Sequence, residues 1–287
     1  TQRTNLHIDD GRTVSRKEAR LTSLVATGEK TVVYVNSRDE SVRLARMLRK
    51  RMRGLSQRIA FYNAGMTRED RARVESAFRE GQLLCIISTS AFGEGVNIPD
   101  IRHVVLYHMP FDLVEFNQMA GRAGRDGQDA WIHVLFDAGD ARINERILTS
   151  SAPSRDALAA LYVSLKQLER TAAQTEEPDD EGRTFFSTSN ADLAAMASSQ
   201  KRGVSIDDKG VSTGIGIFGE LGFLTTTGYG TARRISLVDD PRKMDLMSSI
   251  RYLEGLRERE QFESFRDWVL GSEPEVIKER FDRPIIP

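Results

Sequence analysis

The stretch LLCIISTSAFGEGVNIPDIRHVVLYHMP, residues 83–110, decides the fold of this chain. It contains two continuous apolar runs, at 83–89 and 103–109, and the loop between them is rich in glycine and small polar residues. Continuous rather than alternating hydrophobicity is typical of strands that are covered on both faces. Three similar runs occur elsewhere, at 31–36, 59–64 and 130–136. We therefore expect five buried strands.

Amphipathic helical patterns separate these runs. Ser37 with Glu40 predicts the start of one helix, Thr67 that of a second, and Asp112 with Glu115 that of a third. Strands that alternate with helices of this length predict an α/β fold with a doubly wound, mainly parallel sheet. Ligands of such sheets bind at the carboxyl ends of the strands.

Composition excludes several classes of protein. Of the 287 residues, 39% are hydrophobic and 29% charged, as in soluble globular proteins. No apolar run approaches the roughly 18 residues that a membrane span needs, and no charged-then-apolar leader opens the chain. We expect a cytoplasmic protein without membrane contacts. The single cysteine, Cys85, excludes an internal disulfide and a zinc site built from cysteines.

Small polar residues follow the predicted strands. Ser37 and Arg38 follow the first, Gly65 follows the second, and Thr89 and a glycine-rich loop ending at Asn97 follow the third. Residues of this kind let backbone N–H groups and helix amino termini face an anion. Between residues 38 and 79, twelve Lys and Arg accompany five Asp and Glu, an excess that solvated helix faces explain as well as a phosphate backbone does.

The stretch QMAGRAGRDG, residues 118–127, sets two glycines and two arginines at three-residue spacing. On a helix, Arg122 and Arg125 would share one face, so that both guanidinium groups could reach one target. The glycines would let a backbone or a phosphate approach closely. A surface helix that ends at Gly127, with Asp126 pairing locally with arginine, is the alternative.

These strings, STSAFGEGVNIPDIRHVVLYHMP and EFNQMAGRAGRDG together with VVYVNSR and FYNAGM, resemble four motifs of superfamily-two helicases, most closely of RecQ-like DNA helicases. The resemblance covers residues 30–148. It implies the second of two RecA-like lobes, which close on ATP and move along a nucleic acid strand.

The resemblance also implies roles for individual residues. Arg125 is implied to be the arginine finger that reaches the γ-phosphate of ATP, with Arg122 beside it. The implied residues at the nucleotide are Gly95, Asn97, Gln118 and Gly121, and Gln118 is also implied to couple the lobes. Those implied to hold phosphates of single-stranded DNA are Ser37, Arg38, Gly65 and Thr89.

Two parts of a complete motor are missing from this sequence. No stretch reads as a P-loop, and no acidic motif suited to Mg²⁺ accompanies the strands. We therefore expect ATP and Mg²⁺ to be bound with an N-terminal RecA-like lobe that these residues lack, and we expect no hydrolysis without it. The chain begins without Met, which suggests a piece of something longer.

The carboxyl-terminal half predicts a second module. A helix at 155–174 and an acidic linker precede helical stretches, the first of which Asn190 could cap, and then a hairpin with its turn at 228–230. This order resembles a winged helix, whose wing would display Tyr229, Arg233 and Arg234 to DNA. A small packing module with a solvated hairpin is the alternative.

The predicted domains are therefore a RecA-like helicase C-terminal lobe, a helix with an acidic linker, a winged-helix-like module and C-terminal helices, at 1–150, 151–182, 183–240 and 241–287. RecQ-like helicases usually carry a four-cysteine zinc module, which this sequence cannot form. A weaker resemblance is to the helicase portion of RecJ-type single-strand exonuclease fusions, so a covalently linked exonuclease is a possible partner. Two alternatives stay open, a non-hydrolysing binding module for nucleic acid or a nuclease, and an RNA rather than a DNA helicase.

Overall fold

The computed structural model describes residues 3–92, 97–175, 177–228, 233–238 and 243–281. The chain divides into two compact units. The first comprises Thr1–Asn144 together with Phe262–Pro287, and the second comprises Glu145–Gln261. The boundaries drawn from the sequence do not anticipate that the residues after 261 belong with the first unit.

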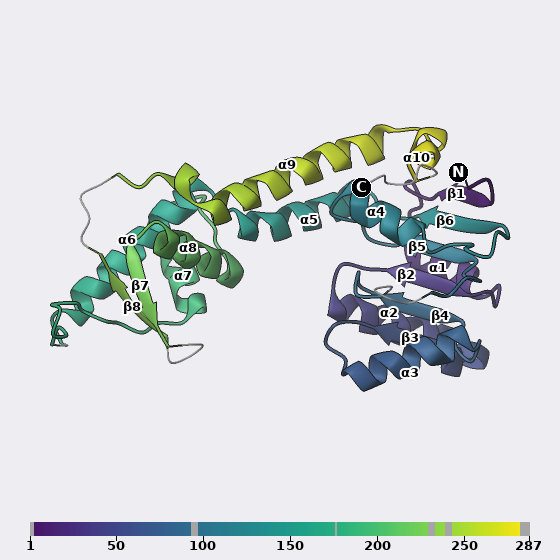
Figure 1. Ribbon diagram of the computed structural model, residues 1–287, viewed down its shortest axis with the longest axis horizontal. Coiled ribbons are helices and arrows are strands. Elements are labelled where there is room, and N and C mark those ends of the chain that lie inside the picture. Colours follow the sequence, from purple (N-terminus) through teal and green to yellow (C-terminus); the bar gives the residue numbers. More distant parts are fainter. Residues whose placement is uncertain (1–2, 93–96, 176, 229–232, 239–242, 282–287) are drawn as a thin grey trace. The chain divides into compact units, whose positions relative to one another are not determined.

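The first unit contains a six-stranded sheet with the order β1-β6-β5-β2-β4-β3 (Figure 1). Its strands are β1 (Leu6–Asp10), β2 (Thr31–Tyr34), β3 (Ile59–Tyr62), β4 (Cys85–Ser88), β5 (His103–Leu106) and β6 (Ala130–Val134). All neighbouring pairs are parallel, and the residues of β2, β4 and β5 are buried throughout. The predicted α/β fold with a parallel sheet is confirmed. The edge strand β1 was not predicted, because LHIDD is short and ends in two carboxylates.

Helices connect the strands of this unit. They are α1 (Lys17–Val25), α2 (Arg38–Arg51), the 3-10 helix η1 (Arg53–Arg58), α3 (Arg68–Arg79) and α4 (Leu113–Ala120). The three predicted caps are present: Ser37, Thr67 and Asp112 each accept a hydrogen bond from the backbone N–H three residues later. In the described part of the chain, no helix is both long and apolar enough to span a bilayer.

The carboxyl-terminal segment packs on α4 and β1. It consists of the end of α9 (Ile250–Gly271) and of α10 (Pro274–Phe281). The rings of Phe265 and Trp268 lie 6.0 and 6.2 Å from that of the fully buried Phe116 on α4. Arg12, which follows β1, donates hydrogen bonds to the carbonyl oxygens of Val269 (2.6 Å) and Ser272 (2.9 Å), and so caps α9.

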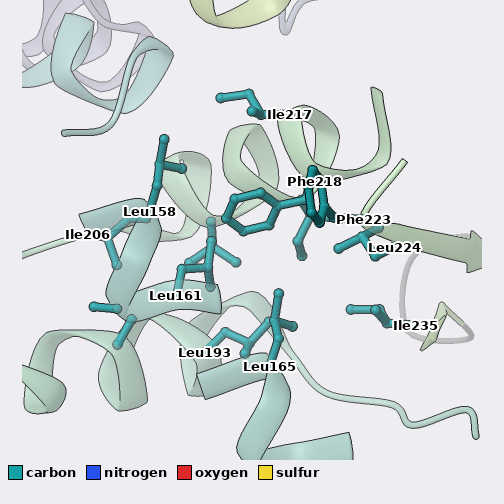
Figure 2. Close-up of a cluster of buried hydrophobic side chains, with 14 of the residues drawn as sticks. Leu158, Leu161, Leu165, Leu193, Ile206, Ile217, Phe218, Phe223, Leu224 and Ile235 are labelled. Carbon is teal, nitrogen blue, oxygen red and sulfur yellow. The ribbon is translucent and has the colours of Figure 1, made fainter. Parts of the chain in front are cut away.

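The second unit combines helices with an antiparallel hairpin. Its elements are α6 (Arg155–Ala172), α7 (Asn190–Gln200), α8 (Asp208–Glu220), β7 (Leu224–Thr227), β8 (Arg234–Leu237) and the 3-10 helix η3 (Leu246–Ser248); the helix α5 (Ala138–Ser151) begins in the first unit and ends in the second. Figure 2 shows the core, in which Leu161, Leu193, Phe218 and Ile235 are among the fully buried side chains. The predicted helices and hairpin are present, but the cap of α7 is Ser189 and not Asn190.

A row of hydrogen-bonded side chains links β1, β5 and β6. His133 Nδ1 lies 2.6 Å from Asp9 Oδ2, which also accepts from Arg20 (2.6 Å). The other ring nitrogen of His133 lies 2.9 Å from His103 Nδ1, and His103 Nε2 lies 2.7 Å from Glu29 Oε2. Burial lowers the pKa of His133 to about 4, although the nearby Asp9 opposes this shift. His133 is therefore neutral near pH 7.

We expect the stability of the first unit to fall as the pH decreases from about 6.5 toward about 4. In this interval an unfolded imidazole binds a proton while folded His133 does not, so acid favours the unfolded state. At pH 5 the expected loss is about 2 kcal/mol in the free energy of unfolding relative to pH 7, measured by urea denaturation. The variant His133→Gln should show a smaller pH dependence, and an unchanged one would contradict this assignment.

Candidate functional site

A groove of about 540 Å³ lies where β2 and β4 end and α4 begins. The residues that line this strand-end groove are Tyr34, Ala64, Thr89, Ser90, Ala91, Phe92, Phe111, Asp112, Val114, Glu115, Gln118, Met119 and Arg122. Three site residues predicted from the sequence, Thr89, Gln118 and Arg122, therefore surround one groove. They come from the loop after β4, from α4 and from the turn that follows α4.

The amide side chains of the half-buried Asn36 and the buried Asn144 fix the start of α4 beside this groove. The side-chain amides of Asn36 and Asn144 both donate hydrogen bonds to the carbonyl oxygen of Met109, at 3.0 and 2.8 Å. Glu115 accepts a hydrogen bond from the backbone N–H of Phe111 (2.7 Å), and burial raises the pKa of this carboxyl group. Hydrogen bonds with the side chains of Asn36, Asn144 and Glu115 thus fix the backbone that leads into α4.

The helix α4 ends at Ala120, so the prediction that Arg122 and Arg125 lie on a helix is wrong. Residues 121–128, which we call the arginine loop, form consecutive turns. The N–H of Arg122 bonds to the carbonyl of Met119 (3.2 Å), three residues back instead of the four of an α-helix.

The glycine at 124 explains why the helix does not continue. Gly124 has a φ of +53°, a left-handed conformation that side chains disfavour. Its N–H donates to the carbonyl of Ile101 (2.9 Å), and the N–H of Asp126 donates to that of Pro99 (3.2 Å). These hydrogen bonds to the segment before β5 replace the helical ones.

The charges of both arginines act on the buried Tyr34. Arg122 lines the groove, whereas Arg125 donates from Nε to the carbonyl of Gly121 (3.1 Å) and from Nη1 to Asn97 Oδ1 (3.4 Å). Burial raises the pKa of Tyr34 and the two guanidinium groups counteract it. Partial burial, followed by the charge of Arg122, lowers the pKa of Arg125. Two guanidinium groups at this end of the sheet suit an anionic ligand.

At the end of β3, the side chain of Arg38 passes over Gly65. A Cβ at Gly65 would lie 3.3 Å from Arg38 Nη1, and the N–H of Gly65 donates to Asn63 Oδ1 (3.0 Å). This N–H is therefore already used, and the glycine serves to give the arginine room. Ser37 and Arg38 are exposed, and the hydroxyl of Ser37 caps α2. Thr89 lies in the groove.

Other predicted residues lie elsewhere or cannot be placed. Gly121 is the C-cap of α4, where a Cβ would lie 2.9 Å from the carbonyl oxygen of Asn117. Gly95 and Tyr229 lie outside the described residues. Within the described ranges, no cluster of three or more His, Cys, Asp or Glu could hold a metal ion.

In the second unit, Arg233 and Arg234 make different contacts. Arg233 Nη2 donates to Asn190 Oδ1 (2.8 Å), and its Nε is buried without a hydrogen-bond partner. The guanidinium of Arg234 lies 5.2 Å from the ring centre of Phe185, a cation–π distance.

The structure adds residues that the sequence did not single out. Tyr34 and Phe111 line the groove, and Arg3 and Asn5 donate hydrogen bonds to backbone carbonyls of the arginine loop. A polar residue before a strand is too common to be recognised as a functional signal. A buried tyrosine at the end of a strand is equally ordinary.

Residues 16–127 match the conserved C-terminal domain of helicases. This part of the chain is a helicase C-terminal domain. Curated relatives include the probable ATP-dependent DNA helicase RecS of Bacillus subtilis, which is 33% identical over 149 residues, 52% of this chain and 28% of that protein. The ATP-dependent DNA helicase RecQ of Haemophilus influenzae is 33% identical over 125 residues, 44% of this chain and 20% of that protein. The similarity to RecQ-family helicases thus covers about half of the chain, and the chain spans less than a third of these relatives.

Solved structures also align with about half of the chain. The E. coli DEAD-box protein SrmB, bound to RraA, is 23% identical and covers 49% of this chain and 81% of that one, with a TM-score of 0.42. The DUF1998 helicase MrfA bound to DNA is 23% identical over 46% of this chain and 20% of that one, with a TM-score of 0.41.

The shape of the arginine loop predicts a difference between two glycines with positive φ. A Cβ at Gly124 would lie 2.7 Å from Asn5 Nδ2, 2.8 Å from Ala130 Cβ and 2.8 Å from the carbonyl oxygen of Gln128, whereas one at Gly127 (φ +84°) would have no neighbour within 4 Å. Gly124→Ala should therefore lower the free energy of unfolding by about 1–3 kcal/mol more than Gly127→Ala does. Urea denaturation measures both, and equal losses would contradict the packing described here.

Proposed function

We propose that this chain provides the second motor lobe of a RecQ-like, ATP-dependent DNA helicase or translocase. The observation that carries the proposal is that Arg122 lines the strand-end groove of a helicase C-terminal domain and that Arg125 lies on the same short loop. Phosphoryl transfer needs positive charge near the oxygens on which negative charge develops, and little covalent chemistry. Two guanidinium groups on one short loop can supply this positive charge.

In this proposal ATP and Mg²⁺ are held mainly by a companion lobe with a P-loop. Arg125 reaches the γ-phosphate when the lobes close, with Arg122 next to it. Asn97, which contacts Arg125 at 3.4 Å, borders the nucleotide. Gln118, on the groove face of α4, couples the lobes, and Gly121 lets them approach closely.

The strand-binding residues lie at the ends of β2, β3 and β4. Arg38 supplies positive charge, Gly65 gives it room, and Ser37 and Thr89 offer hydroxyl groups to phosphates. Contacts with phosphates fix the register of a strand but do not read its sequence. The lobe therefore tracks single-stranded DNA without sequence preference. Arg234, stacked near Phe185, and Arg233 give the second unit a further surface for DNA.

The arginine finger can be tested by ATP hydrolysis in the presence of the companion lobe, supplied on the same chain or as a separate protein. Arg125→Ala should lower kcat by about 10³-fold or more with little change in KM, because the guanidinium acts in the transition state. The matched control is Arg142→Ala, which changes an exposed arginine of the same unit. This chain alone should not hydrolyse ATP. Full activity of Arg125→Ala would exclude the finger, whereas no hydrolysis by the unaltered protein with the companion lobe would favour a non-hydrolysing binding module.

The strand contacts can be tested by binding single-stranded DNA at several salt concentrations. Removing one phosphate contact should reduce the slope of log K against log salt by about one. We expect this from Arg38→Gln but not from Arg46→Gln, an exposed arginine on the same helix. Equal slopes for the two variants would show that Arg38 does not touch the strand.

A further inference from the structure

Two side chains before β1 hold the backbone of the arginine loop. Arg3 Nη2 donates hydrogen bonds to the carbonyl oxygens of Ala123 and Gly124, both at 2.6 Å, and Arg3 Nη1 donates to that of Gly121 at 3.4 Å. Asn5 Nδ2 donates to the carbonyls of Gly124 and Gln128, both at 2.8 Å. Four carbonyls of one eight-residue loop thus depend on residues about 120 positions earlier in the chain.

The loop itself supplies donors to two of these carbonyls: the N–H of Gly127 donates to Gly124 (3.1 Å) and Arg125 Nε donates to Gly121 (3.1 Å). Ala123 and Gly124 are buried, and a buried carbonyl without a partner costs about 1–3 kcal/mol. An α-helix would satisfy them by i to i+4 hydrogen bonds, but the loop is not helical. The planar guanidinium of Arg3 presents several donors in fixed directions, so one side chain can bind several carbonyls that converge.

The opposite side of the loop is held differently. Its N–H groups at Gly124 and Asp126 donate to the carbonyls of Ile101 and Pro99, which precede β5. The loop therefore lies between two segments: the one before β5 accepts hydrogen bonds from its N–H groups, and the one before β1 donates to its carbonyls. Neither Arg3 nor Asn5 lines the strand-end groove, so both act on it through the loop.

We propose that Arg3 and Asn5 are positioning residues that hold the arginine loop in the shape from which Arg122 and Arg125 reach the transferred phosphoryl group. The expected effect on catalysis rests on the proposed function, whereas the expected effect on the structure of the loop does not. Arg3 also adds a third guanidinium group near Arg125, and its charge contributes to lowering the pKa of Arg125. The charges of Arg122 and Arg3 both act on Arg125, so these hydrogen bonds hold the loop against that repulsion.

The structural part is tested on this chain by hydrogen exchange of backbone amides. Arg3→Gln and Asn5→Ala should each speed exchange at Gly124 and Asp126 by about tenfold or more, because the loop opens when its carbonyls lose their donors. The control is Arg58→Gln, since Arg58 also donates to two backbone carbonyls, those of Gly81 (2.6 Å) and Gln82 (3.3 Å), at the end of α3.

Exchange in β4 and β5 shows whether a variant is folded, and Asn5→Ala keeps the experiment decisive if Arg3→Gln does not fold. Unchanged exchange at Gly124 and Asp126 in a folded variant of either residue would overturn the proposal. Faster exchange confined to the arginine loop, and absent in Arg58→Gln, would support it.

The catalytic part is tested by measuring ATP hydrolysis in the presence of the companion lobe, with Arg125→Ala assayed in parallel. Arg3→Gln should lower kcat at least about tenfold with KM for ATP unchanged, and Arg3→Lys should restore part of the loss, since an ammonium donates without the planar fork. If Arg125→Ala abolishes turnover while Arg3→Gln leaves kcat unchanged, the positioning role fails and the proposed function stands. If Arg125→Ala keeps full activity, the proposed function fails and hydrogen exchange alone decides whether the two residues hold the loop.

Discussion

The site depends on how the backbone polar groups of the arginine loop are satisfied. Because the loop leaves the helical path after Ala120, several of its N–H and C=O groups are bound by partners far away in the sequence. Residues before β5 accept from the N–H groups, and Arg3 and Asn5 donate to the carbonyls. A loop that is hydrogen-bonded on both sides presents its arginines in a fixed position, which preorganised charge stabilisation requires.

The groove next to this loop is built from segments that are far apart in the sequence. Asn36, which follows β2, and Asn144, on α5, together fix the entry to α4. From the carboxyl-terminal segment, Phe265 and Trp268 pack on Phe116, on the apolar face of α4. The position of α4, and with it that of the groove residues Gln118 and Arg122, therefore depends on residues beyond those that match the helicase C-terminal domain.

Much of the fold follows from local patterns. Five strands and the caps at Ser37, Thr67 and Asp112 were predicted because burial on both faces and helix capping leave direct marks in the sequence. The strand β1 leaves none, because it is an edge strand of mixed polarity.

The site was predicted less completely. The sequence identified Arg122 and Arg125 but assigned them to a helix, since their three-residue spacing fits one. Hydrogen bonds to Pro99, Ile101, Arg3 and Asn5 decide otherwise, and such long-range partners have no local signature. The packing of Phe265 and Trp268 on α4 was not predicted for the same reason.

In the proposed function, Arg125 stabilises the transition state of phosphoryl transfer rather than the bound nucleotide. The most direct measurement compares the affinity for ADP with aluminium fluoride, which mimics the transferred phosphoryl group, with that for ADP alone, in the presence of the companion lobe. We expect the unaltered protein to prefer the mimic by about 100-fold or more, and Arg125→Ala to lose most of this preference while its affinity for ADP is unchanged. An undiminished preference in Arg125→Ala would contradict the account.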